Sequence, residues 1–306
     1  MVKTGPRCSA QEVARITQQK PHTSSNCPNN NAWMTALLEE TADLSSVTII
    51  SVGCNKGDDF VSQMRDWSRN PIFSPSTYTS TQQRLFGRFN RACRGAAQTR
   101  HITGKSREIR GFCIEPMPSN YKLLTQTMSA LNYTDSVTLL QNAISSTNGM
   151  TQFPNAATGT ESLGIGMGAN HVDVVMSTLD SIMESRKIHD VEFLSIDTEG
   201  NDMRAIIGCV RSLYTKKIRY LEFEYHSVGR WAFSDLQDLI DILDQLDFAC
   251  YWALNSGGLC RLTGCWHDMY YKQRTWSNVA CINRASKHTY ARMQEISSRV
   301  RVESRP

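Results

Sequence analysis

The chain has 306 residues, and its shares of hydrophobic (40%) and charged (20%) residues are ordinary for a globular protein. No apolar run approaches the roughly 20 residues of a membrane-spanning helix, and the N-terminus lacks the apolar segment of a signal peptide. The net charge of +4 hides a local excess, because residues 65–110 hold ten basic and two acidic residues. The composition therefore predicts a globular fold without a membrane span, built as one large domain or two small ones.

Residues 1–45 are predicted to form a polar arm followed by a leading helix. The first 31 residues are polar, with several prolines and asparagines, and one short helix is expected near 11–18. Residues 32–43 have helical spacing, and their apolar face is made of Trp33, Met34, Leu37 and Leu38.

A glycine-rich turn follows the first predicted strand and is the first indication of a ligand site. The strand, residues 47–52, is apolar and β-branched, and a helix is predicted over 58–69. The turn between them contains Gly53, Asn55, Lys56 and Gly57. Because glycine lets the backbone approach a ligand and a helix N-terminus offers free N–H groups, this pattern predicts a nucleotide-type site. A plain strand-to-helix turn would also use two glycines, so neighbouring segments must decide.

A basic insertion, residues 71–107, is predicted to separate the first helix from the second strand. Its segment 82–94 has helical period, with apolar residues on one side. Basic residues recur on the other side, at Arg84, Arg88, Arg91 and Arg94. Two interpretations stay open: a solvated helix face, or a surface for an anionic partner such as an anionic substrate, a membrane surface or a nucleic acid.

The second and third predicted strands, residues 109–114 and 137–141, end in polar side chains. Glu115 follows the second strand, and a carboxylate at that place is suited to holding the two hydroxyls of a ribose. Residues 147–170 are predicted to be a glycine- and threonine-rich loop, and a short strand is expected over 172–176.

The fourth and fifth predicted strands, residues 191–196 and 218–225, end in ionisable side chains. Those at or just beyond the strand ends are Asp197, Glu199, Glu224 and His226. Ligands bind at this edge of an open α/β sheet, so these side chains are candidates for acid–base chemistry. Helix capping by the acids and a structural role for His226 are the alternatives. A metal ion held by Asp197 and Glu224 is not required by the sequence, and no metal ligand is predicted.

The C-terminal part is predicted to close the sheet. A helix over 234–246 precedes a hairpin within 248–262, a last strand spans 277–283, and residues 286–306 form a basic tail. Alternating strands and helices followed by a hairpin predict a three-layer α/β sandwich, with a mostly parallel sheet closed at one edge by the antiparallel hairpin. The main domain is predicted over 46–285.

The ten cysteines fall into two groups. Five lie in or beside apolar segments and are expected to be buried free thiols, namely Cys54, Cys113, Cys209, Cys250 and Cys281. One or two disulfides are compatible with the polar surroundings of Cys8, Cys27, Cys93, Cys260 and Cys265. One glycosylation sequon, Asn132-Tyr133-Thr134, is present, although such triplets are common by chance. The sequence leaves the compartment undecided: the missing signal peptide and membrane span favour the cytoplasm, and the secretory lumen stays open if an anchor precedes this sequence.

Four segments carry a family resemblance in sequence order. They are Val-Gly-Cys-Asn-Lys-Gly (52–57), Ile-Glu-Pro-Met-Pro-Ser-Asn-Tyr (114–121), Gln-Asn-Ala-Ile-Ser (141–145) and the stretch from Ser177-Thr-Leu-Asp to Phe-Leu-Ser-Ile-Asp-Thr-Glu-Gly-Asn-Asp (193–202). Together they resemble the FkbM family of S-adenosylmethionine-dependent methyltransferases, within the Rossmann-like class I group.

The resemblance implies S-adenosylmethionine as cofactor and O-methylation of a hydroxyl on a sugar, glycan or other small metabolite. It places the cofactor at Gly53, Asn55, Lys56, Gly57, Glu115, Asn142 and Ala143. The acceptor side is expected to hold Asp197, Glu199 and His226, with His226 or Asp197 as the base that takes the hydroxyl proton.

Two departures from the family pattern keep other functions open. Ser51 stands where the family usually has an acid that helps to hold the amino group of the cofactor, and the basic insertion is not a family feature. The alternatives are therefore a non-catalytic binding module with a degenerate pocket, or an RNA methyltransferase that uses the arginine-rich insertion. A nicotinamide enzyme fits less well, because the turn lacks the second close glycine of the dinucleotide fingerprint.

Overall fold

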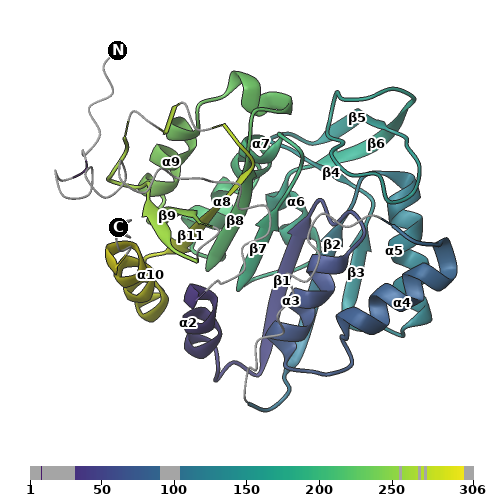
Figure 1. Cartoon of the computed structure of the whole chain (residues 1–306), viewed down its shortest axis with the longest axis horizontal. Helices are drawn as coiled ribbons and strands as arrows, with labels where there is room; N and C mark the ends of the chain where they lie inside the picture. The colour runs from purple at the N-terminus through teal and green to yellow at the C-terminus, as the bar shows by residue number, and fades with distance from the viewer. Residues whose placement is uncertain are drawn as a thin grey trace, which may run out of the picture.

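The computed structural model describes residue 8 and residues 32–89, 104–254, 257–267, 270–271 and 274–299. A sheet of eight strands, in the order β10-β9-β11-β8-β7-β1-β2-β3, runs through the molecule (Figure 1). Its strands are β1 (Ser46–Val52), β2 (Glu108–Ile114), β3 (Val137–Leu140), β7 (Phe193–Ile196), β8 (Tyr220–Tyr225), β9 (Phe248–Ala253), β10 (Leu259–Arg261) and β11 (Ser277–Asn283).

Five neighbouring strands of this sheet, from β3 to β8, are parallel. Strand β11 lies antiparallel between β8 and β9, and β10 pairs antiparallel with β9 at the edge. The predicted three-layer α/β sandwich, with a mostly parallel Rossmann-like sheet and an antiparallel hairpin at one edge, is confirmed. Parallel strands are connected by helical crossovers, so helices cover both faces of the sheet. The strands are therefore buried on both sides, and their sequences are mostly apolar runs.

The helices form the two outer layers. They are α2 (Ala32–Glu40), α3 (Asp58–Ser68), α4 (Pro75–Phe86), α5 (Pro118–Ala130), α6 (Leu179–Ser185), α7 (Asp202–Ile207), α8 (Val210–Tyr214), α9 (Leu236–Gln245), α10 (Lys287–Arg299) and the 3₁₀ helix η1 (Gly229–Phe233). Side chains of α2 to α5 and α10 belong to the core on one face of the sheet, and those of α6 to α9 to the core on the other. No helix of the described residues is long and apolar enough to cross a membrane.

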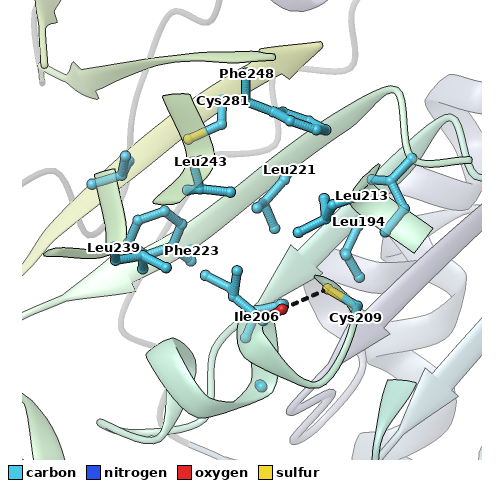
Figure 2. Close-up of a cluster of buried hydrophobic side chains, with 14 of the residues drawn as sticks. Leu194, Ile206, Cys209, Leu213, Leu221, Phe223, Leu239, Leu243, Phe248 and Cys281 are labelled. Carbon is cyan, nitrogen blue, oxygen red and sulfur yellow. Dashed lines mark hydrogen bonds between the residues drawn. The ribbon is translucent and has the colours of Figure 1, made fainter. Parts of the chain in front are cut away.

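Alternation along the strands divides the core between these two faces. In β1, Ile50 and Val52 belong to one core, while Val47 and Ile49 belong to the other. Figure 2 shows part of the first core, where Leu221 and other side chains of β7, β8 and α9 pack together. Each such side chain, when fully buried, stabilises the fold by about 1.5–3 kcal/mol.

A second sheet, of three strands, lies beside the carboxyl edge of the first. It is formed by β4 (Ala143–Ile144), β5 (Gly149–Pro154) and β6 (His171–Ser177), in the order β4-β6-β5. The prediction of a loop over 147–170 is therefore wrong at its start, where β5 lies. Strand β5 has only two buried residues, Phe153 and Pro154, so its alternating pattern in the sequence is weak.

The helix predicted over 82–94 is wrong in both bounds, since α4 begins at Pro75 and ends at Phe86. Ser74 caps its start by accepting a hydrogen bond from the amide of Thr77, and Gly87, with a φ of 85°, follows its end. Arg84 is exposed on α4, whereas Arg88 is exposed beyond the helix. The predicted arginine stripe is thus interrupted at Gly87, and Arg91 and Arg94 lie outside the described residues.

The cysteines are paired more extensively than expected. Disulfides join Cys8 to Cys265, Cys54 to Cys113 and Cys250 to Cys281. Four of the five expected free thiols are therefore bonded, whereas the free thiol at Cys209 is confirmed, and Cys260 is also a buried thiol that takes no part in these three bridges. The expectation failed because an apolar surrounding suits a buried disulfide as well as a buried thiol. Cys27, Cys93 and the short helix expected near 11–18 lie outside the described residues.

Candidate functional site

An open pocket of about 570 Å³ lies at the carboxyl edge of the main sheet, where β1, β2 and β7 end. The predicted site residues that line it are Gly53, Asn55, Glu115, Asn142, Asp197 and Glu199. Those absent from its lining are Lys56, Gly57, Ala143 and His226. The pocket occupies the place where open α/β sheets bind ligands.

The glycine turn brings the backbone of β1 against the end of β7. Gly53 has a φ of 83°, and a β-carbon there would overlap the carbonyl oxygen of Asp197. Gly57 has a φ of 78° and is the N-cap residue before α3, and a β-carbon there would lie 2.5 Å from the hydroxyl oxygen of Tyr78. Both positions therefore require glycine, for space as well as for backbone conformation.

Glu115 is fixed within the pocket by two backbone groups. Its carboxylate accepts hydrogen bonds from the amides of Asn55, at 2.7 Å, and Met117, at 2.9 Å. Burial raises the pKa of Glu115 to about 7, although both hydrogen bonds act in the opposite direction. Each carboxylate oxygen keeps a second lone pair, so the group can still accept hydrogen bonds from two ligand hydroxyls.

One half of the pocket is apolar and was missed by the sequence analysis. Its walls are Met117, Ile144, Phe153, Leu163 and Ile165. Phe153 belongs to β5, in the segment that was predicted to be a loop, so no sequence signal placed it. Asn201 also lines this pocket, and its amide nitrogen donates to the carbonyl of Ile144 at 2.8 Å. The amide oxygen of Asn201 is buried and unpaired among the described residues, so it can accept a hydrogen bond from a ligand.

Four carboxyl groups gather at the ends of β7 and β8, namely Asp197, Glu199, Asp202 and Glu224. The pKa of each is raised, chiefly by burial and then by the negative charges of neighbouring carboxylates. Asp202 braces the loop by accepting hydrogen bonds from the amides of Thr198, at 3.3 Å, and Gly200, at 3.1 Å. Such a cluster favours a cationic ligand, because a positive charge relieves the repulsion.

His226 is fully buried, and its hydrogen bonds identify its tautomer. Its Nδ1 atom accepts a hydrogen bond from the amide of Val228 at 3.0 Å, so the neutral ring carries its proton on Nε2. Burial lowers the pKa of His226 to about 4, which keeps the ring neutral. Nε2 lies 3.6 Å from Oε2 of Glu224 and has no hydrogen-bond partner among the described residues. In this geometry Nε2 of His226 is a hydrogen-bond donor, and the ring's lone pair, on Nδ1, is occupied by the amide of Val228.

Glu199, Glu224 and His226 bring polar side-chain atoms close together beside the pocket. One ligand atom from each lies within 4.8 Å of the others, a spacing compatible with a metal ion. The tautomer of His226 argues against that use, because a metal ligand needs a free lone pair on Nε2. Three atoms this close have a common point within about 2.8 Å of each, which is an ordinary hydrogen-bond distance. The trio can therefore surround one hydroxyl, with His226 donating to its oxygen and a carboxylate accepting its hydrogen.

Lys56 and Ser51 lie away from the pocket. The buried ammonium group of Lys56 pairs with Glu161. The backbone carbonyl of Lys56 accepts a hydrogen bond from the hydroxyl of Tyr78 at 2.8 Å. Ser51 lines a separate cavity of about 270 Å³, which also contains Asp59 and Glu222. Ala143 pairs through its backbone with β6.

A model of the family described as "Methyltransferase FkbM domain" matches residues 91–250, more than half of the 306 residues. The match includes Glu115, Asn142 and the segment 193–202, but it begins after the glycine turn. No curated protein matches the chain in sequence.

Three solved structures illustrate the distant likenesses. Methyltransferase FkbM from Methylobacillus flagellatus KT is 12% identical, with a TM-score of 0.45, over 90% of this chain and 56% of its own. The METTL16 methyltransferase domain is 9% identical, with a TM-score of 0.36, over 82% and 64% of the two chains. Precorrin-8w decarboxylase from Methanobacterium thermoautotrophicum is 10% identical, with a TM-score of 0.34, over 82% and 89%. This chain spans little more than half the length of the first of these, and likenesses this weak carry no argument about function.

Proposed function

This chain belongs to the Methyltransferase FkbM domain family, and we propose that it transfers the methyl group of S-adenosylmethionine to a hydroxyl oxygen of a sugar, glycan or other small metabolite. The observation that carries this proposal is the position of the trio Glu199, Glu224 and His226, a site for one hydroxyl, beside a pocket suited to the cofactor.

The lining of the pocket offers a partner for each part of S-adenosylmethionine. Glu115 would accept hydrogen bonds from the ribose hydroxyls, and the apolar half around Phe153 would take the adenine ring. The unpaired oxygen of Asn201 would accept a hydrogen bond from the adenine amino group. Gly53 leaves room for the methionine part, and Asp197 beside it would hold the ammonium group in place of the acid missing at Ser51.

The cofactor supplies a methyl group that is activated by a positively charged sulfur. The residues of the chain then have to hold the acceptor hydroxyl in line and remove its proton, and positioning of this kind supplies much of the barrier reduction. His226 would orient the hydroxyl by donating from Nε2. Glu199 would take the proton, because it lines the pocket and its carboxylate has a buried oxygen, Oε2, without a hydrogen-bond partner among the described residues. This assignment differs from the expected base at His226 or Asp197, since the lone pair of His226 is occupied by the amide of Val228.

Titration with S-adenosylhomocysteine in a calorimeter is the first test, and it should give saturable heat with one site per chain. A screen of hydroxylated acceptors with labelled cofactor would then identify the acceptor, and Glu199→Gln should lower turnover at least 100-fold. Absence of heat at millimolar ligand would favour the alternative of a binding module with a degenerate pocket. The RNA methyltransferase alternative loses its motivation in the described residues, because Gly87 interrupts the arginine stripe.

A further inference from the structure

Asn132 begins the triplet Asn132-Tyr133-Thr134 and lies at the exposed C-terminal end of α5. Its φ of 56° is left-handed, and the amide that follows it, of Tyr133, donates to the carbonyl of Met128 at 3.0 Å. This is the usual way in which a helix ends, and asparagine is one of the few residues that adopt the left-handed conformation readily. Helix termination therefore explains an asparagine at 132, but it does not explain a threonine at 134.

Tyr133 holds the triplet so that its outer residues face solvent. The tyrosine is buried, its hydroxyl donates to the carbonyl of Ile72 at 2.5 Å, and its ring meets Phe73 edge-on at 4.9 Å. Asn132 and Thr134, on either side, are both exposed. Within the described part of the chain, neither of their side chains makes a hydrogen bond. The fold thus anchors the centre of the triplet and leaves its amide and hydroxyl free.

The disulfides independently indicate the environment in which the chain folds. Cys250 and Cys281 face each other across β9 and β11, and Cys54 and Cys113 link the glycine turn to β2. A third bridge spans 257 residues of sequence. Structural disulfides persist in oxidising compartments and are rare in the cytosol. Each bridge forms when two thiols lose two protons and pass two electrons to a protein-disulfide oxidant, which such compartments supply.

We infer that the chain folds in the oxidising lumen of a secretory pathway and that Asn132 is an acceptor of an N-linked glycan there. The glycan would come from a polyprenyl-pyrophosphate carrier. A bond forms between Nδ2 of Asn132 and the anomeric carbon, the bond from that carbon to the pyrophosphate oxygen breaks, the lipid pyrophosphate leaves, and the amide loses one proton. This proposal selects the secretory lumen from the two compartments that the sequence leaves open.

A glycan at Asn132 is compatible with the proposed active site. Helix α5 begins at Pro118, close to Glu115 in the pocket, and its 13 residues carry the chain about 20 Å away. The modification would therefore cover the far end of α5 and leave the pocket open. The inference does not depend on methyl transfer, and its test reads the glycan alone.

The test expresses the full chain behind a cleavable signal peptide in a eukaryotic secretory host. Treatment with a peptide N-glycosidase should increase the mobility of the wild-type chain, and mass spectrometry should place the glycan on Asn132. Asn132→Gln and Thr134→Ala should both lose the shift. Thr134→Ser is the matched control, because serine keeps the sequon on the same surface, and it should retain the shift.

A wild-type chain that enters the lumen and carries an unmodified Asn132 would overturn the glycan proposal. Chain that is retained in the cell can be treated with the same enzyme, so poor secretion does not remove the readout. A peptide map without reductant should recover the Cys54–Cys113 and Cys250–Cys281 bridges. Free thiols at these positions in the lumenal protein would overturn the proposed compartment.

Discussion

Gly53 lies so close to the main-chain carbonyl of Asp197 that a β-carbon at position 53 would overlap the carbonyl oxygen. The same two strand ends are also joined by a hydrogen bond from the amide of Asp197 to the carbonyl of Val52, at 2.9 Å. Because both residues line the pocket, the shape of the proposed cofactor site depends on this contact.

Gly53→Ala should therefore destabilise the fold and remove cofactor binding together. We expect a loss of at least about 2 kcal/mol in unfolding free energy, from the overlap added to the left-handed backbone. Gly166→Ala is the matched control, since Gly166 has a φ of 79° but no atom within 4 Å of the added carbon. It should cost about 1 kcal/mol and leave S-adenosylhomocysteine binding intact. Urea unfolding and calorimetry measure both effects, and equal costs for the two variants would contradict the role given to the Asp197 contact.

Glu115→Gln should weaken cofactor binding without unfolding the chain. A charge-assisted hydrogen bond contributes about 1.5–3 kcal/mol, so the affinity for S-adenosylhomocysteine should fall about 10- to 100-fold. Calorimetric titration measures this change. Glu184→Gln serves as the control, because Glu184 is exposed on α6. This variant should bind S-adenosylhomocysteine as the wild type does. Unchanged affinity in Glu115→Gln would show that this carboxylate does not hold the ribose.

The parts of the site that the sequence predicts are those encoded locally. The glycine turn and Glu115 each follow a buried strand of seven residues, and neighbouring parallel strands end at the same edge. Local signals also predicted the mostly parallel sheet and the antiparallel hairpin at its edge, because alternating strands and helices permit few arrangements.

The features of the site and the fold that the sequence did not predict depend on contacts between distant segments. Phe153 enters the pocket from a short strand that pairs only within the second sheet, and such a strand has little pattern of its own. The partner of Cys250 is set by the register between β9 and β11, which residue type does not encode. The tautomer of His226 depends on a backbone amide two residues later, so the side chain alone suggested a base where the fold makes a donor.

The rate of methyl transfer should rise with pH because Glu199 must be ionised to act as base. Burial, and then the charges of Asp197 and Asp202, raise the pKa of Glu199 to about 8, so the carboxylate is mostly protonated below that pH. With the acceptor found by the screen, kcat/KM should increase from about pH 6, reach half its maximum near pH 8 and level off above about pH 9. The profile is measured with saturating cofactor from about pH 5 to about pH 9.5, which is roughly three units below and about one and a half units above that pKa.

His226→Gln separates the two roles proposed for this site. Glutamine can still donate a hydrogen bond, so turnover should fall while the midpoint of the pH profile stays near that of the wild type. Glu199→Gln should instead remove the rising limb along with most of the activity. A limb that disappears in His226→Gln and persists in Glu199→Gln would assign the base to the histidine.

Loss of the Cys54–Cys113 bridge should weaken cofactor binding as well as destabilise the fold. Cys54 lies between Gly53 and Asn55, and Cys113 precedes Glu115 by two residues, so the bridge ties the turn to the strand that carries the ribose acid. The double variant Cys54→Ala/Cys113→Ala should bind S-adenosylhomocysteine about tenfold more weakly, which corresponds to about 1.4 kcal/mol.

The matched control for that variant is Cys250→Ala/Cys281→Ala, which removes a bridge whose residues do not line the pocket. Removal of a disulfide typically costs about 2–4 kcal/mol of stability, so this control should unfold at lower denaturant yet bind the ligand normally below its transition. Adding reductant to the wild type should reproduce the weaker binding, and it should have no further effect on the affinity of the Cys54→Ala/Cys113→Ala variant. If both double variants bind as tightly as the wild type, the bridge at the turn serves stability alone and Glu115 is positioned without it.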